Sequence, residues 1–157
     1  MDSLDARRPF VTSAFSESAP AVSPSGRLLA YASDETGTDQ IYLINMPMAG
    51  ARVPVSVGGG TEPAWSRDGS RLYFRGPARM MVATITERPT PAVARIDSLF
   101  VDRYFRERWN RQYDVLRDGR LLMVGVSGRE EAASASLFAI VNWQAMLGAS
   151  RPERGER

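Results

Sequence analysis

A short motif that occurs three times constrains the fold of this chain more than any other feature of its sequence. The first two copies read Pro20-Ala-Val-Ser-Pro-Ser-Gly26-Arg-Leu-Leu-Ala-Tyr31 and Pro63-Ala-Trp-Ser-Arg-Asp-Gly69-Ser-Arg-Leu-Tyr-Phe74. A weaker copy follows as Tyr113-Asp-Val-Leu-Arg-Asp-Gly119-Arg-Leu-Leu-Met-Val124. The three glycines are 43 and then 50 residues apart. A period of this length indicates repeated supersecondary units that each bury a face against the next unit.

Each unit is expected to contain short antiparallel strands joined by turns. The glycine of the motif supplies the positive φ that such a turn needs, as at Gly26. No segment has a convincing helical period, so we predict an all-β fold. The expected strands are 21–23, 28–33, 40–46 and 52–57 in the first unit, 64–66, 71–75, 80–86 and 98–101 in the second, and 113–116, 121–127 and 137–143 in the third.

Four strands to a unit favour a β-propeller over a sandwich. Three units are fewer than the 4–8 blades of a usual propeller, so we predict a partial propeller with an incomplete last blade. The expected organisation is an N-terminal arm with a lone strand at 9–15 (residues 1–16), blade 1 (17–60), blade 2 (61–112), incomplete blade 3 (113–147, with a helical turn at 144–147) and a disordered tail (148–157).

The open ends of such a structure predict self-association. Two radial faces, lined by strands at 41–44 and 138–141, would be exposed and apolar. The spare strand at 9–15 could complete a missing upstream blade, or it could complete the last blade of another copy. We therefore expect head-to-tail homo-oligomers, in which two copies could close a six-bladed ring.

The composition excludes most catalytic chemistry. The chain has no Cys and no His, and all 20 of its basic residues are Arg. A Ser-His-Asp triad, an ordinary zinc site, a Walker lysine and a Schiff base are therefore absent, although a paired-carboxylate mechanism stays open. We expect no enzymatic activity and no cofactor.

Charge and hydropathy give weaker expectations. The net charge of +2 is too small to indicate nucleic-acid binding. The sequence has no apolar run of the length, about 18 residues, that a membrane-spanning helix requires. Its first residues also lack the apolar segment of a signal peptide. As written, the chain is expected in the cytoplasm.

The richest candidate binding surface is the segment 102–114, where arginines alternate with aromatic residues. Its members are Arg103, Tyr104, Arg106, Arg108, Trp109 and Arg111. Such a mixture can bind an anionic ligand. The alternative is a loop whose aromatic side chains pack between blades while its arginines pair with nearby acids. Two other candidates are better explained as turns: the run Gly58-Gly59-Gly60 rather than a phosphate cradle, and the acids Asp34, Glu35 and Asp39 rather than a calcium site.

The repeats resemble the WD40-like (PD40) repeat of the TolB-type β-propeller. The resemblance covers 17–126 and rests on the motif copies and on Ile41-Tyr42. The run Gly58 to Pro63, with Val141-Asn142-Trp143, is similar to the C-terminal end of propellers attached to bacterial serine/threonine kinases. Ser25 and Leu116-Arg117 depart from the Ser-Pro-Asp-Gly pattern.

This resemblance implies a non-catalytic sensor or scaffold module that binds a protein or a small ligand, as the C-terminal piece of a kinase. Two alternatives are a propeller piece of a prolyl-peptidase-like hydrolase whose catalytic domain lies elsewhere and a free-standing structural module. The resemblance also allows a periplasmic location for a longer protein.

Overall fold

The computed structural model describes residues 9–47, 50–107 and 110–125 and, for the backbone alone, 126 and 135–140. Eleven strands in these residues form three antiparallel sheets. The first sheet holds β1 (Glu17–Val22), β2 (Leu28–Ser33), β3 (Gln40–Asn45) and β4 (Val53–Pro54). The second holds β5 (Thr61–Trp65), β6 (Arg71–Arg75), β7 (Arg79–Thr86) and β8 (Ala92–Val101). The third holds β9 (Tyr113–Val115), β10 (Leu121–Val126) and β11 (Ala135–Ile140).

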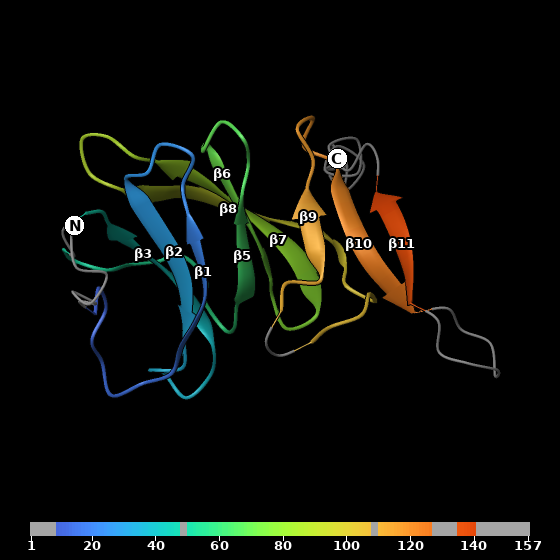
Figure 1. The fold of residues 1–157 in the computed structure, drawn as a ribbon, viewed down its shortest axis with the longest axis horizontal. Coiled ribbons are helices and arrows are strands. Elements are labelled where there is room, and N and C mark those ends of the chain that lie inside the picture. The colour runs from blue at the N-terminus through green and yellow to red at the C-terminus, as the bar shows by residue number, and fades with distance from the viewer. Residues whose placement is uncertain (1–8, 48–49, 108–109, 127–134, 141–157) are drawn as a thin grey trace, which may run out of the picture.

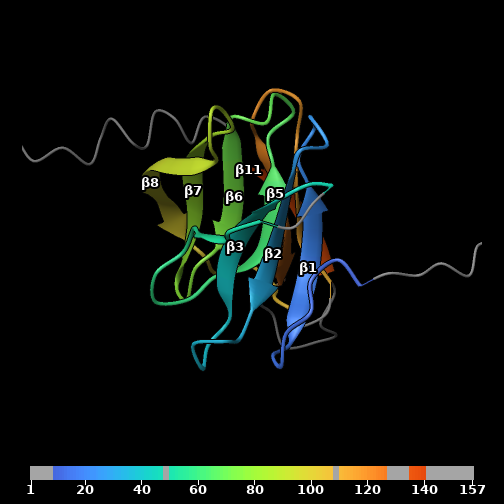
Figure 2. The same cartoon turned by 90° about the vertical axis from the view of Figure 1, so that its left-hand side faces the viewer.

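The three sheets are consecutive blades of a partial β-propeller. Each sheet is a simple up-and-down array, and the sheets follow one another in chain order (Figure 1). The first strands of the blades are neighbours, because β5 contacts β1 and β9 contacts β5. Figure 2 shows the first sheet in front of the second, so the blades pack face to face. The all-β partial propeller predicted from the repeat is thus confirmed.

The turn glycines have the predicted backbone. The φ angles of Gly26, Gly69 and Gly119 are 71°, 74° and 83°, a region that other residues enter at a cost. In each turn the glycine N–H donates to the carbonyl three residues earlier, at 2.8–3.0 Å. The third turn is one residue shorter on its far side. Leu121, not residue 122, therefore occupies the position that Leu72 holds in blade 2.

Apolar side chains fill the two spaces between blades. The cluster between blades 1 and 2 is made of Leu28, Ala30, Ala32, Ile41, Leu43, Val55, Leu72, Phe74, Ala83 and Ile85. The cluster between blades 2 and 3 is made of Ala64, Tyr73, Met80, Val82, Leu99, Tyr113, Leu121 and Met123. Burial of these faces is the main stabilising term, at roughly 25 cal/mol per Å² of apolar surface.

The lone strand predicted at 9–15 is wrong. Residues 9–16 contain no strand, because the segment is held by side chains rather than by backbone pairing. Phe10 and Val11 pack against Tyr31, Tyr42 and Ile44 on the outer face of blade 1. The N–H of Ser16 donates to Asp34 Oδ1 at 2.9 Å. The arm therefore covers part of the radial face that the sequence left exposed.

Strand boundaries differ where local patterning is weak. The outer strand β8 begins at Ala92 rather than at residue 98, because an edge strand is largely exposed and has little apolar alternation. The inner strands β1 and β5 begin earlier than predicted, at Glu17 and Thr61. The expected strand end at 141–143, the helical turn at 144–147 and the tail at 148–157 lie outside the described residues.

Candidate functional site

The inner strands β1 and β5 are irregular at equivalent positions. Their pairing is interrupted by bulges, between Ser18 and Ala21 in β1 and between Thr61 and Ala64 in β5. Ala19 (φ 50°) and Glu62 (φ 53°) occupy the bulges in the left-handed region. A non-glycine residue in that region costs of order 1–3 kcal/mol, and such residues concentrate at functional sites.

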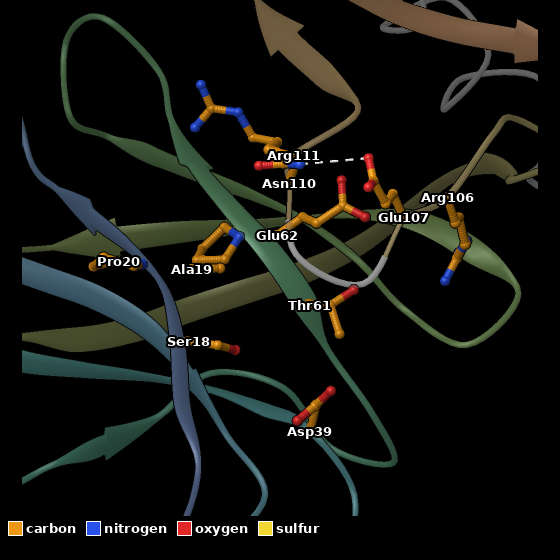
Figure 3. A pocket seen from close by; sticks show the side chains of 11 residues that line it. Ser18, Ala19, Pro20, Asp39, Thr61, Glu62, Arg106, Glu107, Asn110 and Arg111 are labelled. Atoms are coloured by element: carbon orange, nitrogen blue, oxygen red, sulfur yellow. Dashed lines mark hydrogen bonds between the residues drawn. The ribbon is translucent and has the colours of Figure 1, made fainter.

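A pocket of about 430 Å³ opens where these bulges face the segment that joins blade 2 to blade 3. Figure 3 shows the side chains of β1 on one wall and those of β5 and the joining segment on the other. The pocket is lined by Ser18, Ala19, Pro20, Asp39, Thr61, Glu62, Pro63, Arg106, Glu107, Asn110 and Arg111. Its lining mixes apolar residues with side chains of both charges.

A fully buried arginine holds Glu62, which lines this pocket. The guanidinium of Arg75 has no exposed side-chain surface. Its Nε lies 3.1 Å from Asp102 Oδ2, and its Nη1 lies 3.3 Å from Glu62 Oε1. The same Nη1 donates to the carbonyl of Phe105 at 2.7 Å. Arg75 thus joins β6, the bulge of β5 and residues 102–105. A buried charge is costly when alone, so this guanidinium needs its two carboxylate partners.

Further hydrogen bonds fix the joining segment. Arg106 Nη2 donates to Asp102 Oδ2 at 2.6 Å and to the carbonyl of Gly76 at 2.8 Å. The N–H of Gln112 donates to Glu62 Oε2 at 2.8 Å. Tyr113 Oη donates to the carbonyl of Glu62 at 2.5 Å, and burial raises the pKa of this phenol well above its usual value. These internal hydrogen bonds hold the pocket wall in place.

One carboxylate in the pocket is uncommitted. Within the described residues, no hydrogen bond or ion pair engages the carboxylate of Asp39, and only its backbone carbonyl is used, by the N–H of Gly60 at 2.7 Å. Glu107 accepts from Gln112 Nε2 at 2.9 Å and from Asn110 Nδ2 at 3.5 Å. Asp39 can therefore accept from a ligand without losing an internal partner.

The structure divides the predicted arginine and aromatic surface. Arg106 and Arg111 line the pocket, and both pair locally, since Arg111 Nη2 lies 3.4 Å from Asp114 Oδ1. Tyr104 packs into the cluster between blades 2 and 3, with its ring 6.0 Å from that of Phe100. Arg103 is exposed and outside the pocket. Arg108 and Trp109 lie outside the described residues.

Sequence reasoning assigned Asp39 to a turn and missed Ser18, Thr61 and Glu62. An alignment of the first two repeats could have identified Glu62. Glu62 and Arg75 stand where the first repeat has Ala19 and Ala32. An oppositely charged pair that replaces two alanines on neighbouring strands indicates a feature that the blade itself does not need.

The glycine run and the acidic turn have ordinary surroundings. Gly58 and Gly59 have φ angles of 80° and 125° between β4 and β5. A Cβ on Gly60 would lie 2.5 Å from Ser56 Oγ, so close packing of the inter-blade turn accounts for that glycine. Among the described residues, no cluster of acids is arranged to hold a metal ion, and no helix is long and apolar enough to cross a membrane.

Comparisons with known proteins give only distant structural likenesses. Neither a protein-family model nor a curated protein matches the sequence. The chain is similar to oligogalacturonate lyase from Vibrio parahaemolyticus, with 15% identity, a TM-score of 0.44 and coverage of 68% of this chain and 27% of that one. It is similar to TolB from Acinetobacter baumannii, with 16% identity, a TM-score of 0.41 and coverage of 83% of this chain and 42% of that one. The chain thus spans well under two thirds of either protein.

Proposed function

We propose that this chain is a non-catalytic binding module whose ligand, a small polar molecule or a segment of a partner protein, occupies the pocket between β1, β5 and the residues 106–107 and 110–111. The observation that carries the proposal is the pairing of Arg75 with Glu62 and Asp102. This network holds a strained bulge and a loop in place around a hollow of about 430 Å³, and a preformed wall of this kind lowers the cost of binding.

The charges of the pocket favour a ligand that carries both signs. Asp39 offers a carboxylate without an internal partner, while Arg106 and Arg111 contribute guanidinium groups to the same lining. The hydroxyls of Ser18 and Thr61 add donors and acceptors. A free peptide end or an amino-acid-like zwitterion suits this set, because its ammonium and carboxylate groups would each meet an opposite charge.

Titration with a pool of free tripeptides, followed by saturation-transfer NMR, tests the pocket. Asp39→Asn should weaken peptide binding at least about fivefold, as expected for loss of one charge-assisted hydrogen bond. Asp97→Asn, a carboxylate on β8 outside the pocket, is the matched control and should bind as the wild type does. Equal binding by the two variants, or no binding by the wild type at millimolar peptide, would refute the assignment.

The absence of catalysis is a separate part of the proposal. The pocket lining has hydroxyls and carboxylates but no histidine, cysteine or lysine to activate them. The purified chain is expected to leave peptides, esters and ATP unchanged over hours. Turnover that a point mutation in the pocket abolishes would overturn this part and favour the paired-carboxylate alternative.

We further propose that the module belongs to a longer protein, as the C-terminal propeller piece of a serine/threonine kinase. This rests on the resemblance of the repeats. The second candidate is a propeller piece of a prolyl-peptidase-like hydrolase. Reading the DNA upstream of Met1 separates the two, since an in-frame kinase domain supports the first and an in-frame peptidase domain supports the second.

A further inference from the structure

A second charged hollow lies further along the inner strands, next to the pocket described above. The pocket is lined by residues 18–20 and 61–63, whereas this hollow is lined by residues 20–22 and 65–67 and by Val115 of β9. The two hollows share Pro20 and Arg111. The turns that follow these strands lie together at one edge of the molecule (Figure 1). Arg67 and Arg117 occupy the same position in the turns of blades 2 and 3, directly before Asp68-Gly69 and Asp118-Gly119.

The fold does not require arginine at this position. The equivalent residue of the first turn is Pro24, and that turn has the same hydrogen bond from its glycine. Both arginines are exposed. Within the described residues, neither side chain forms a hydrogen bond or an ion pair, whereas the guanidinium of Arg120, in the same turn as Arg117, pairs with Asp118 at 2.6 Å.

The acids near these two arginines are already engaged. Asp68 accepts from Ser66 Oγ at 2.6 Å and from Ser70 Oγ at 2.8 Å, and these hydrogen bonds lower its pKa. Asp118 accepts from the N–H of Arg120 at 3.1 Å and from its guanidinium. The positive charge of Arg67 and Arg117 is thus left for a ligand.

Both arginines line two adjoining hollows, which we call the arginine groove. The first, of about 520 Å³, lies between the turns of blades 2 and 3 and is lined by Ser66, Arg67, Asp68, Arg71, Tyr73, Leu116, Arg117, Asp118 and Gly119. The second, of about 510 Å³, continues along the inner strands. The two share Ser66, Arg67 and Arg117. The groove carries four arginines, at 67, 71, 111 and 117, and two aspartates, at 68 and 118.

The inner part of the groove is apolar. It is lined by Pro20, Val22, Pro24 and Val115, and by the indole of Trp65, whose Nε1 donates to the carbonyl of Ala21 at 2.9 Å. That hydrogen bond fixes the ring against β1. Val22 is 52% exposed, so the apolar surface is open to solvent. A ligand that fits the groove needs anionic groups for the arginines and apolar groups for this surface.

We propose that the arginine groove binds an acidic, partly apolar segment of a protein in an extended conformation. Each guanidinium presents a fork of donors that matches a carboxylate. Two such forks on neighbouring turns, beside an open apolar strip, suit successive acidic side chains that alternate with apolar ones. A nucleic acid would supply phosphates but needs a larger basic surface than the chain's net charge of +2 provides.

Fluorescence anisotropy at low ionic strength tests the groove, with a labelled octapeptide in which glutamate alternates with leucine as the probe. The double variant Arg67→Gln/Arg117→Gln should bind at least about tenfold more weakly, because both charge-assisted pairs are lost. The control Arg88→Gln/Arg95→Gln removes the same charge from exposed positions at and beside β8, and it should bind within about twofold of the wild type. Thermal melting verifies that both variants are folded.

Three outcomes would overturn the proposal. The first is equal affinity of the two double variants, which would show a non-specific charge effect. The second is equal binding of a probe that carries glutamine in place of glutamate. The third is tighter binding of a single-stranded oligonucleotide than of the acidic peptide, lost in Arg67→Gln/Arg117→Gln. Because Asp39 is not part of the groove, Asp39→Asn should bind the acidic probe normally, so this test and the tripeptide test fail independently.

Discussion

Substitution of Arg75 by methionine tests whether the buried ion pairs of this residue stabilise blade 2 and the wall of the pocket. The change removes a guanidinium that lies within 3.3 Å of Glu62 and 3.1 Å of Asp102 and donates to the carbonyl of Phe105. Methionine keeps most of the side-chain volume, so the main loss is charge and hydrogen bonding. The side chains of Glu62 and Asp102 are 8% and 0% exposed, and water cannot replace the lost partner.

The expected cost follows from that burial. Removal of one partner from a buried ion pair destabilises a protein by about 3–5 kcal/mol. Asp102 retains Arg106, whose side chain is 35% exposed, so the lower part of that range is expected. For a chain of this length each kcal/mol lowers Tm by about 2–4 °C. The melting temperature of Arg75→Met should therefore fall by roughly 10 °C.

Circular dichroism melts and urea titrations measure the effect. Arg95→Met is the control, because Arg95 pairs with Asp97 on the surface and its side chain is 69% exposed. It should change stability by less than about 0.5 kcal/mol. A Tm for Arg75→Met within about 2 °C of the wild type would show that the buried network does not stabilise the fold.

A compensated variant separates charge from packing. Glu62→Gln and Asp102→Asn, added to Arg75→Met, remove the carboxylates that were left without a partner. Blade 1 folds with Ala19 and Ala32 at the positions of Glu62 and Arg75, so the blade does not itself need the charges. Most of the lost stability should return. If the triple variant is no more stable than the single one, the loss comes from packing and not from an uncompensated charge.

Three further predictions concern the turns, the tyrosines and the N-terminal arm. Gly69→Val should lower the free energy of unfolding by about 1–3 kcal/mol. The φ of Gly69 is 74° and the nearest atom to an added Cβ is 3.5 Å away, so the strain is in the backbone alone. Gly69→Asn should have a melting temperature closer to that of the wild type, and equal melting temperatures for the two variants would exclude backbone strain as the cause. Burial raises the pKa of Tyr42 from 10.0 to about 12, so the folded state retains a proton that the unfolded state loses. Stability should therefore decline as pH rises from about 10 towards 12. Tyr42→Phe should lessen this decline, and a variant with the same pH profile as the wild type would contradict the role of Tyr42. The chain should self-associate head to tail, as measured by light scattering. Phe10→Ser/Val11→Ser should increase the association by uncovering Tyr31 and Ile44. If the wild type and this variant are both monomers, the prediction is contradicted.

The sequence alone was sufficient for those parts of the fold that depend on neighbouring residues. The strands β2 and β6 have the predicted limits, and the three turn glycines have the predicted positive φ. Strand alternation and turn chemistry are properties of a few consecutive residues, so a repeated motif reports them directly. The repeat also predicted the number of blades among the described residues, because each copy of the motif marks one antiparallel unit.

Packing between blades decided the rest. The bulges at Ala19 and Glu62 break the alternation that would have revealed the start of β1 and β5. The burial of Arg75 depends on Asp102, which is 27 residues away along the chain. Arg67 and Arg117 line the same hollow only because two turns from different blades are adjacent. The packing of Phe10 on Tyr31 is likewise a contact between segments that do not pair. No local pattern encodes such contacts, because they depend on how the faces of separate blades are brought together.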